Sequence, residues 1–393
     1  MTKNYIDADE VEQWFEEEVD DSSIVDDEKL DPATKYARSQ LRVVRETKDY
    51  QLDYLQHALK PGKELIDTAP AYQRRLRWSN KKRSLLIESF LLNIPVPPVF
   101  LFERDYNAYE VIDGRQRIET IRAFLSSEFA LSGLEYWPEL NRKRFNELPQ
   151  VLQKGLLRRS LPAVVLLAET KEATEGGLDV RRLLFDRLNT GGMRLNPQEL
   201  RNALYPGELN ALLIRIARSK VFTQTWGIPA YKKSEDVAPS EELVKNPLFS
   251  SLADAELVLR FFALRDAVQN SGAGSLRRIL DRFMREKQLI SHRAAVLMEA
   301  EYKETLSRLN EVFGGHPFRL PKTSRPSRPL YDALMIALSL NSHLDVEKRK
   351  RKIQSALAAA LAGADTYDVL VGRGNTMESV IERVELARQI LQA

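Results

Sequence analysis

The segment YEVIDGRQRIETIRAF, residues 109–124, contains the change from strand to helix on which the fold assignment depends. Its first four residues form an apolar run typical of a strand, and ETIRAF continues with helical spacing. Between the two stand one carboxylate, one glycine and two guanidiniums: Asp113, Gly114, Arg115 and Arg117. Glycine permits a positive φ or a close approach of another chain segment. The pattern therefore predicts a tight turn from a strand into a helix.

The start of the predicted helix can accept an anion, because its first N–H groups point outward and the helix dipole is positive there. Arg115 and Arg117 lie two residues apart and cannot face the same way, so one can bind a phosphate while the other pairs with a carboxylate or nucleic acid. Asp113 can hold Mg²⁺ beside phosphates or orient an attacking water, which Gln116 can position. A charged turn that merely caps a helix is the alternative, and this segment alone leaves both open.

The surrounding pattern predicts a small mixed α/β unit. KKRSLLIESFLLNI, residues 81–94, is an amphipathic helix that ends at Pro95. VPPVFLF (96–102) and YEVI (109–112) predict the two strands of a hairpin, and LPAVVLLAE (161–169) predicts a further strand.

A second polar constellation is FDRLNTGGMRLNPQELRNAL, residues 185–204. It ends one helix at a Thr-Gly-Gly turn and begins another with Asn196 as N-cap and Pro197 in the first turn. Polar side chains beside a fresh helix start can hold phosphates, although glycine turns between helices are also routine.

A third constellation is AYQRRLRWS, residues 71–79. Basic residues with Tyr72 and Trp78 among them suit base stacking and phosphate contact. Equally, Trp78 can be a core anchor with surface arginines around it.

Beyond about residue 245 no convincing strand appears, and apolar positions recur at helical spacing, which predicts a helical domain. Two basic runs lie within it, KTSRPSRP (322–329) and EKRKRK (347–352). Either can contact phosphates, or be an ordinary solvated face.

Charge is distributed unevenly along the 393 residues. Residues 1–31 hold 13 Asp or Glu and two Lys, a local net charge of −11, so the remainder must carry +14 to give +3 overall. A basic body suggests a polyanionic partner, for which the acidic segment can compete. That segment is too acidic to fold alone, but it can form a docked amphipathic helix, because four apolar residues have helical spacing: Val11, Trp14, Phe15 and Val19.

The composition excludes several classes of protein. The chain has no cysteine, so disulfides, thiolate metal sites and cysteine nucleophiles are excluded. No basic start followed by an apolar run and no stretch of membrane-spanning length is present. We therefore expect a soluble, cytoplasmic protein without a membrane partner.

Four motifs in this order and spacing resemble the DGQQR-motif family, a domain family of unknown function that includes the N-terminal domain of GmrSD-type modification-dependent restriction enzymes. They are YQRRLRWS, LIESFLLNIPVPPVFLF, YEVIDGRQRIETIRAF and FDRLNTGGMRLNPQELRNA, within about residues 65–205. The helical remainder is similar to the helical extension of many members.

This resemblance implies a fold and a site. The fold is α+β: a small mixed-sheet ParB/sulfiredoxin-like core followed by a large all-helical C-terminal domain. The implied domains are an acidic, flexible segment 1–32, a nucleotide- and DNA-binding domain 33–240 and a helical domain 241–393. ParB proteins hold a nucleotide's phosphates with a G-x-R-R box and a later L-N-P-x-E box, which residues 114–117 and 195–199 resemble.

The implied site residues fall into four groups. The catalytic group is Asp113, Gln116 and Arg117, with Asp113 also the metal ligand. The nucleotide-binding and phosphate-binding group is Arg74, Gly114, Arg115, Asn189, Thr190 and Gly191. The DNA-binding group is Arg75, Arg77 and Trp78. The implied cofactors are Mg²⁺ and an NTP, with GTP, ATP and CTP not distinguished.

The chain departs from the family pattern in three respects. The family has Gln where Arg115 stands, and Arg75 and Leu76 replace its usual Pro-Tyr. An HNH nuclease signature is also missing, since the four histidines do not have its spacing: His57, His292, His316 and His343. Any HNH site is therefore expected on a separate nuclease subunit.

These observations favour an anti-phage restriction component that binds and hydrolyses an NTP at the DGRQR motif to control DNA cleavage, by itself or through a partner nuclease. Two alternatives remain open. One is a DNase that uses the same motif without NTP, and the other is a non-enzymatic, nucleotide-switched DNA-binding protein. DNA and the NTP are the expected partners, and family analogy adds a homo-oligomer.

Overall fold

The computed structural model describes most of the chain. The described residues are 6–19, 45–59, 65–67, 78–105, 107–167, 196–236, 239–270, 272, 274–321, 325–372, 374 and 376–393.

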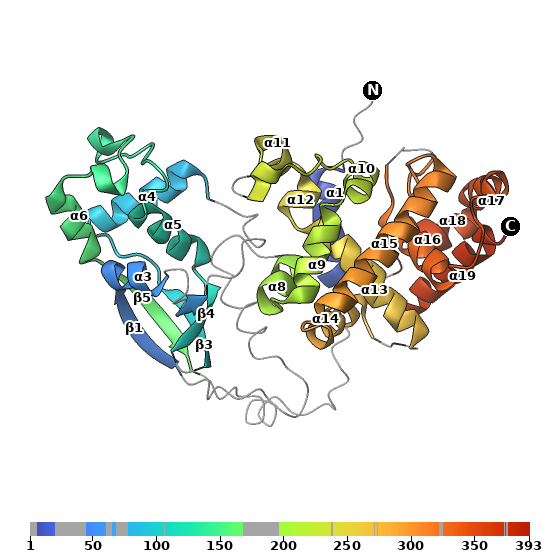
Figure 1. The fold of residues 1–393 in the computed structure, drawn as a ribbon, viewed down its shortest axis with the longest axis horizontal. Helices are drawn as coiled ribbons and strands as arrows, with labels where there is room; N and C mark the ends of the chain where they lie inside the picture. The colour runs from blue at the N-terminus through green and yellow to red at the C-terminus, as the bar shows by residue number, and fades with distance from the viewer. Residues whose placement is uncertain are drawn as a thin grey trace. The chain divides into compact units, whose positions relative to one another are not determined.

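The chain folds into two compact units, each of which is described by itself (Figure 1). The sheet unit is Lys29–Arg194. The helical unit joins Met1–Glu28 to Leu195–Ala393, so the sheet unit is inserted between two parts of the helical one.

This division differs from the expected boundary at residue 240. Helices α8 (Pro197–Leu204) and α9 (Glu208–Ala217) pack on α13 (Ala253–Gln269), deep in the helical unit. The apolar side of α9, including Leu209, Leu212 and Ile216, is wholly buried. These helices therefore share the core of the helices that follow them.

The described part of the sheet unit contains a five-stranded mixed sheet with the order β1-β5-β3-β4-β2. Its strands are β1 (Arg45–Gln51), β2 (Ile66–Asp67), β3 (Val99–Asp105), β4 (Ala108–Asp113) and β5 (Ser160–Leu166). Strands β1 and β5 pair antiparallel, as do β3 and β4, whereas β3 pairs with β5 and β2 with β4 in parallel. The predicted hairpin, the later strand and the small mixed sheet are confirmed.

Helices cover one face of this sheet. They are α3 (Leu52–Ala58), α4 (Asn80–Leu91), α5 (Arg115–Leu125) and α6 (Gln150–Leu157), with single turns at Pro138–Leu140 and Phe145–Glu147. Side chains alternate along a strand, so Leu161, Ala163 and Val165 of β5 share one face and are buried. They belong to the same apolar core as Ile118 and Ile121 of α5, which places the start of α5 at the rim of a packed core.

Helices make up the helical unit, as predicted for the C-terminal part (Figure 1). After α8 and α9 come α10 (Lys220–Trp226), a single turn at Lys233–Asp236, α11 (Glu241–Val244), α12 (Pro247–Ser250), α13, α14 (Leu276–Glu286), α15 (His292–Phe313), α16 (Arg328–Leu340), α17 (Lys350–Ala362), α18 (Ala364–Val371) and α19 (Met377–Leu391). Among the described residues, no helix combines the length and the apolar character needed to cross a membrane.

Helix α1 (Ala8–Val19) belongs to the helical unit and packs against α12 and α14. Val11, Trp14 and Phe15 are buried, which confirms the docked amphipathic helix for these residues. The Trp14 ring meets Trp226 edge to face, with 6.4 Å between centroids. Helix α1 is thus docked through these three side chains, and the part of the acidic segment from residue 20 to 32 lies outside the described residues.

Candidate functional site

The turn predicted at Gly114 is present and needs glycine for two independent reasons. Gly114 has φ +91°, in the left-handed region that residues with a side chain rarely adopt. A Cβ at this position would also lie 2.3 Å from Cγ1 of Val99 on β3. Next to this turn, the register between β3 and β4 shifts by one residue: Phe100 pairs with Asp113, but Leu101 pairs with Val111. Strand β4 therefore ends in a tight corner pressed against its neighbour.

Helix α5 begins at this corner without a side-chain cap. Gly114 is the N-cap and has no side chain to bond the first N–H groups, and no acidic residue stands in the first turn. Its carbonyl accepts from the N–H groups of Arg117 and Ile118, at 2.9 and 3.1 Å. A helix start carries the positive end of the helix dipole, so a start without a side-chain cap or an acidic residue suits an anion.

Asp113 and Arg117 pair across the turn. Arg117 Nη2 lies 2.7 Å from Asp113 Oδ2, and Arg117 Nη1 donates to the carbonyl oxygens of Pro97 and Pro98 at 2.6 and 3.2 Å. The Arg117 side chain is only 12% exposed, whereas that of Asp113 is 30% exposed. Arg117 thus ties the segment before β3 to the end of β4, and Asp113 presents the more accessible half of the pair.

Arg115 and Gln116 contact different parts of the sheet unit. Arg115 Nε donates to Oε1 of Glu119, one turn along α5, at 2.9 Å. Gln116 Oε1 accepts from the backbone N–H of Trp78 at 3.1 Å. The structure therefore brings two predicted site residues from different motifs together, Gln116 and Trp78.

The indole of Trp78 is partly buried against the core of the sheet unit, and Lys82 Nζ lies 4.8 Å from its ring centroid. This packing supports the core-anchor interpretation, and its role in DNA binding stays a prediction. Six of the predicted site residues lie outside the described residues: Arg74, Arg75, Arg77, Asn189, Thr190 and Gly191.

Asp113 fits the predicted Mg²⁺ only as part of a larger ligand set. One of its carboxylate oxygens is engaged by Arg117. Within the described residues, no group of three or more His, Asp or Glu is arranged to hold a metal. Mg²⁺ commonly takes one or two carboxylates together with substrate phosphates and water. Asp113 can therefore serve an ion that arrives with a nucleotide.

The LNPQE segment forms a different kind of helix start, in the helical unit. Asn196 Oδ1 accepts from the N–H groups of Gln198 and Glu199 at 3.0 and 2.9 Å, and Glu199 Oε2 accepts from the N–H of Asn196 at 2.8 Å. This capping box, with Pro197 in the first turn, confirms the predicted start of α8. Burial raises the pKa of the Glu199 carboxyl to about 7.

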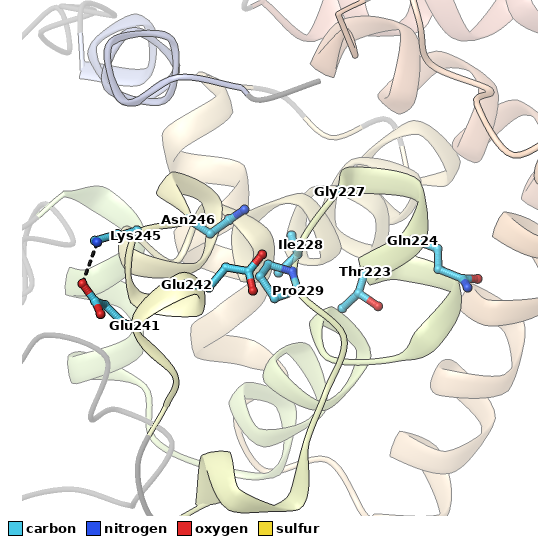
Figure 2. A pocket seen from close by; sticks show the side chains of 9 residues that line it. All are labelled: Thr223, Gln224, Gly227, Ile228, Pro229, Glu241, Glu242, Lys245 and Asn246. Atoms are coloured by element: carbon cyan, nitrogen blue, oxygen red, sulfur yellow. Dashed lines mark hydrogen bonds and ion pairs between the residues drawn. The ribbon is translucent and has the colours of Figure 1, made fainter. Parts of the chain in front are cut away.

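A pocket that the sequence did not suggest lies between α10 and α11 (Figure 2). It has a volume of about 710 Å³, and its lining is mostly polar: Thr223, Gln224, Gly227, Ile228, Pro229, Glu241, Glu242, Lys245 and Asn246. Lys245 Nζ contacts Glu241 Oε1 at 2.6 Å, and this bond lowers the pKa of the Glu241 carboxyl. In the sequence, the local sign of this pocket is Gly227, which ends α10 and lies among the lining residues; its φ is +68°.

The fold and the corner together define a small mixed-sheet domain in which a glycine turn leads from a strand into a helix without a side-chain cap. Residues 55–206 match the family model described as the GmrSD restriction endonuclease, N-terminal domain. The matched range contains the DGRQR corner and ends just after α8. The resemblance inferred from the motifs is therefore confirmed, and these residues carry an N-terminal domain of the GmrSD type. Neither the curated proteins nor the solved structures gave a match to the chain.

Proposed function

We propose that this protein is a restriction-system component that binds an NTP at the DGRQR corner and hydrolyses it to control DNA cleavage. The observation that carries the proposal is the uncapped start of α5 at Gly114, flanked by Asp113, Arg115 and Arg117 within the family-matched range. A glycine turn leading into a helix start is the common protein solution for binding phosphates.

Each residue of the corner has a role in this proposal. The first turn of α5 receives the phosphates, and Arg115 exchanges Glu119 for a phosphate oxygen. Arg117, already held by Asp113 and two backbone carbonyls, keeps the corner in shape. Asp113 would hold the Mg²⁺ that accompanies the nucleotide, and this ion would offset the charge of the phosphates, while Gln116 orients the water. That water adds to the terminal phosphorus and gives its proton to a phosphate oxygen, the bond to the bridging oxygen breaks, and NDP and phosphate leave.

In this proposal the nucleotide state of the corner controls DNA cleavage, either by this protein itself or by a partner nuclease. The given residues show no HNH spacing, which favours the partner. The ParB-like ancestry of the sheet and a homo-oligomeric state are parts of the same proposal that rest on the family resemblance alone.

Asp113→Asn tests the site, because it keeps the shape of the side chain and removes its charge. We expect NTP hydrolysis with Mg²⁺ to fall by about 100-fold or more, as is usual when a group that positions the reacting water or metal is lost. Phosphate release is measured with GTP, ATP and CTP in turn, and nucleotide binding is measured with fluorescent analogues.

Glu128→Gln is the matched control. It removes a carboxylate that pairs with Arg122, also on α5, at 2.6 Å but away from Gly114. It should leave hydrolysis unchanged. Hydrolysis by Asp113→Asn at the wild-type rate would show that the site assignment is wrong. Plasmid nicking without NTP would support the direct DNase, and binding without either reaction would support a nucleotide-switched DNA-binding protein.

A further inference from the structure

The helical unit carries a dense basic cluster at the start of α17, which we call the basic turn: Lys348, Arg349, Lys350, Arg351 and Lys352. All five residues are exposed. From Asn341 to Ala362 the chain has these five basic residues and only two acidic ones, Asp345 and Glu347. The patch is therefore strongly positive over a single helical turn and the residues before it.

The two nearby carboxylates do not neutralise the patch. Glu347 is bound by Arg308 of α15, with Nε 2.7 Å from Oε1, and Asp345 is bound by Lys348 at 2.5 Å. Lys350, Arg351 and Lys352 make no ion pair or side-chain hydrogen bond with any residue that the structure describes. Three cationic side chains thus remain available to an outside anion.

These charges do not stabilise their own helix. Lys350, Arg351 and Lys352 occupy the first turn of α17, which has no acidic residue. The positive end of the helix dipole lies in this turn and disfavours cations there. Three adjacent cations also repel one another. The local electrostatics therefore oppose the arrangement, and a bound polyanion would relieve both effects.

The backbone beneath the basic turn is held firmly. Before it, Arg308 binds the carbonyl oxygens of Ser342 and Leu344 as well as Glu347. After it, α17 is anchored by side chains buried at every fourth position: Ile353, Leu357 and Leu361. Arg349 Nη1 donates to the carbonyl of Gln392 at 3.0 Å. The charges are presented on a fixed surface, so little order has to be gained on binding.

We propose that the basic turn binds the phosphate backbone of duplex DNA without regard to sequence. The choice of DNA rests on the proposed function. An anionic membrane is the less favoured partner, because helices that bind membrane surfaces expose an apolar face beside their basic residues. The large apolar side chains of α17 are buried, and none of the exposed large apolar side chains in the described residues belongs to α17.

The test compares two triple variants of the full chain that lose equal charge. Lys350→Gln/Arg351→Gln/Lys352→Gln neutralises the basic turn. The control, Arg282→Gln/Arg285→Gln/Lys287→Gln, neutralises three exposed residues on and just after α14. Duplex binding is measured by fluorescence anisotropy of a labelled random-sequence duplex over a series of salt concentrations. Thermal unfolding of each variant confirms that it folds.

We expect the basic-turn variant to bind duplex DNA about 10- to 100-fold more weakly at physiological salt. The slope of log K against log salt concentration should flatten by about 0.9 for each lost phosphate contact. The melting temperature of the basic-turn variant should match or exceed that of the wild type, because the substitutions remove positive charges from the positive end of the α17 dipole. The control should keep most of the wild-type affinity and slope.

Three outcomes would overturn the proposal: wild-type affinity and slope in the basic-turn variant, an equal loss in the control, or binding to phosphatidylserine vesicles that depends on these residues while duplex binding does not. NTP hydrolysis without DNA, measured on the same samples, separates this proposal from the function it rests on. Absence of hydrolysis in the wild type would count against the nucleotide site and leave the anisotropy comparison valid.

Discussion

Two helices in this protein begin in polar segments, but only one of the two starts is capped by side chains. Helix α5 in the sheet unit follows Gly114, whose φ is positive and which offers no side chain to the first N–H groups. Helix α8 in the helical unit follows Asn196, whose side chain accepts from two N–H groups while Glu199 bonds back to the Asn196 N–H. Asn196 Nδ2 also donates to the carbonyl of Ser251 at 2.8 Å.

The difference shows that a sequence resembling a phosphate-binding box must also be checked for side-chain caps on its helix start. Both segments resemble boxes that hold nucleotide phosphates in ParB proteins, but an N–H group that is bonded to its own cap cannot also bond a phosphate. The α8 start satisfies itself and fixes the helix within its unit, so its role is structural. The α5 start has no side-chain cap, and its first residue follows a strained turn at Gly114.

The largest effect should come from Gly114→Ala. The substitution places a Cβ at a positive φ and within 2.3 Å of Val99, so backbone strain and steric overlap add together. We expect the sheet unit to lose on the order of 4 kcal/mol of unfolding free energy. Hydrogen exchange of β3 and β4 in the full chain measures this loss.

Gly155→Ala is the matched control, because Gly155 lies inside α6 in the same unit and a Cβ there meets nothing within 4 Å. It should stabilise the unit by about 0.5–1 kcal/mol through helix propensity. Equal protection in the two variants would show that the corner is not strained.

The next effect concerns the closed start of α8 and depends on pH. Burial raises the pKa of Glu199 from 4.5 to about 7, so the folded state favours the protonated form. Its contribution to stability is complete below pH 4.5 and is lost as the pH rises through 7. One pKa unit corresponds to about 1.4 kcal/mol, so the loss can reach about 3 kcal/mol.

Glu199→Gln removes this titration and retains an oxygen that can accept from Asn196. Urea unfolding at pH 5 and pH 8 should show the variant gaining on the wild type at the higher pH. A constant difference between the two proteins at both pH values would contradict the assignment.

The smallest effect is expected from Asn196→Ala, which opens the start of α8. Loss of an N-cap costs about 1 kcal/mol, and the partly buried carbonyl of Ser251 also loses its donor. Denaturant unfolding should show a decrease of about 1–2 kcal/mol in the free energy of unfolding, while the nucleotide binding proposed at the DGRQR corner should not change. Loss of nucleotide binding in this variant would instead indicate that the LNPQE segment binds phosphates.

The elements near the corner could be predicted because their signals are local. Pro95 ends the predicted helix 81–94, and the structure places α4 at Asn80–Leu91. Asn196 and Pro197 mark the start of α8 correctly, and the need for glycine at Gly114 follows from the strand-to-helix turn. The identity of the segment pressed against Gly114, Val99, required the fold, because the two residues meet only through strand pairing.

Strand β1 and the division into units could not be predicted from local patterns. RETKDYQ (Arg45–Gln51) is polar and lies at the edge of the sheet, so it lacks the alternation of apolar residues that marks a half-buried strand. The helices from 197 onward join the helical unit through packing between residues far apart in sequence. Likewise, Arg117 donates to two backbone carbonyls about twenty residues away as well as to Asp113, and the sequence carries no signal for those two distant partners.

Helix α1 precedes the inserted sheet unit in the chain, yet its backbone is bound by α16, which follows that unit. Arg328 Nη1 donates to the carbonyl of Trp14 at 2.9 Å, across 314 residues. During synthesis, the apolar face of α1 stays exposed until the sheet unit and the helices that follow it have been made. A clone that begins at residue 55, where the family match begins, and keeps the residues after it would lack α1 and uncover Trp226 in the helical unit. Expression trials should therefore keep the N-terminal helix, or supply it as a separate peptide.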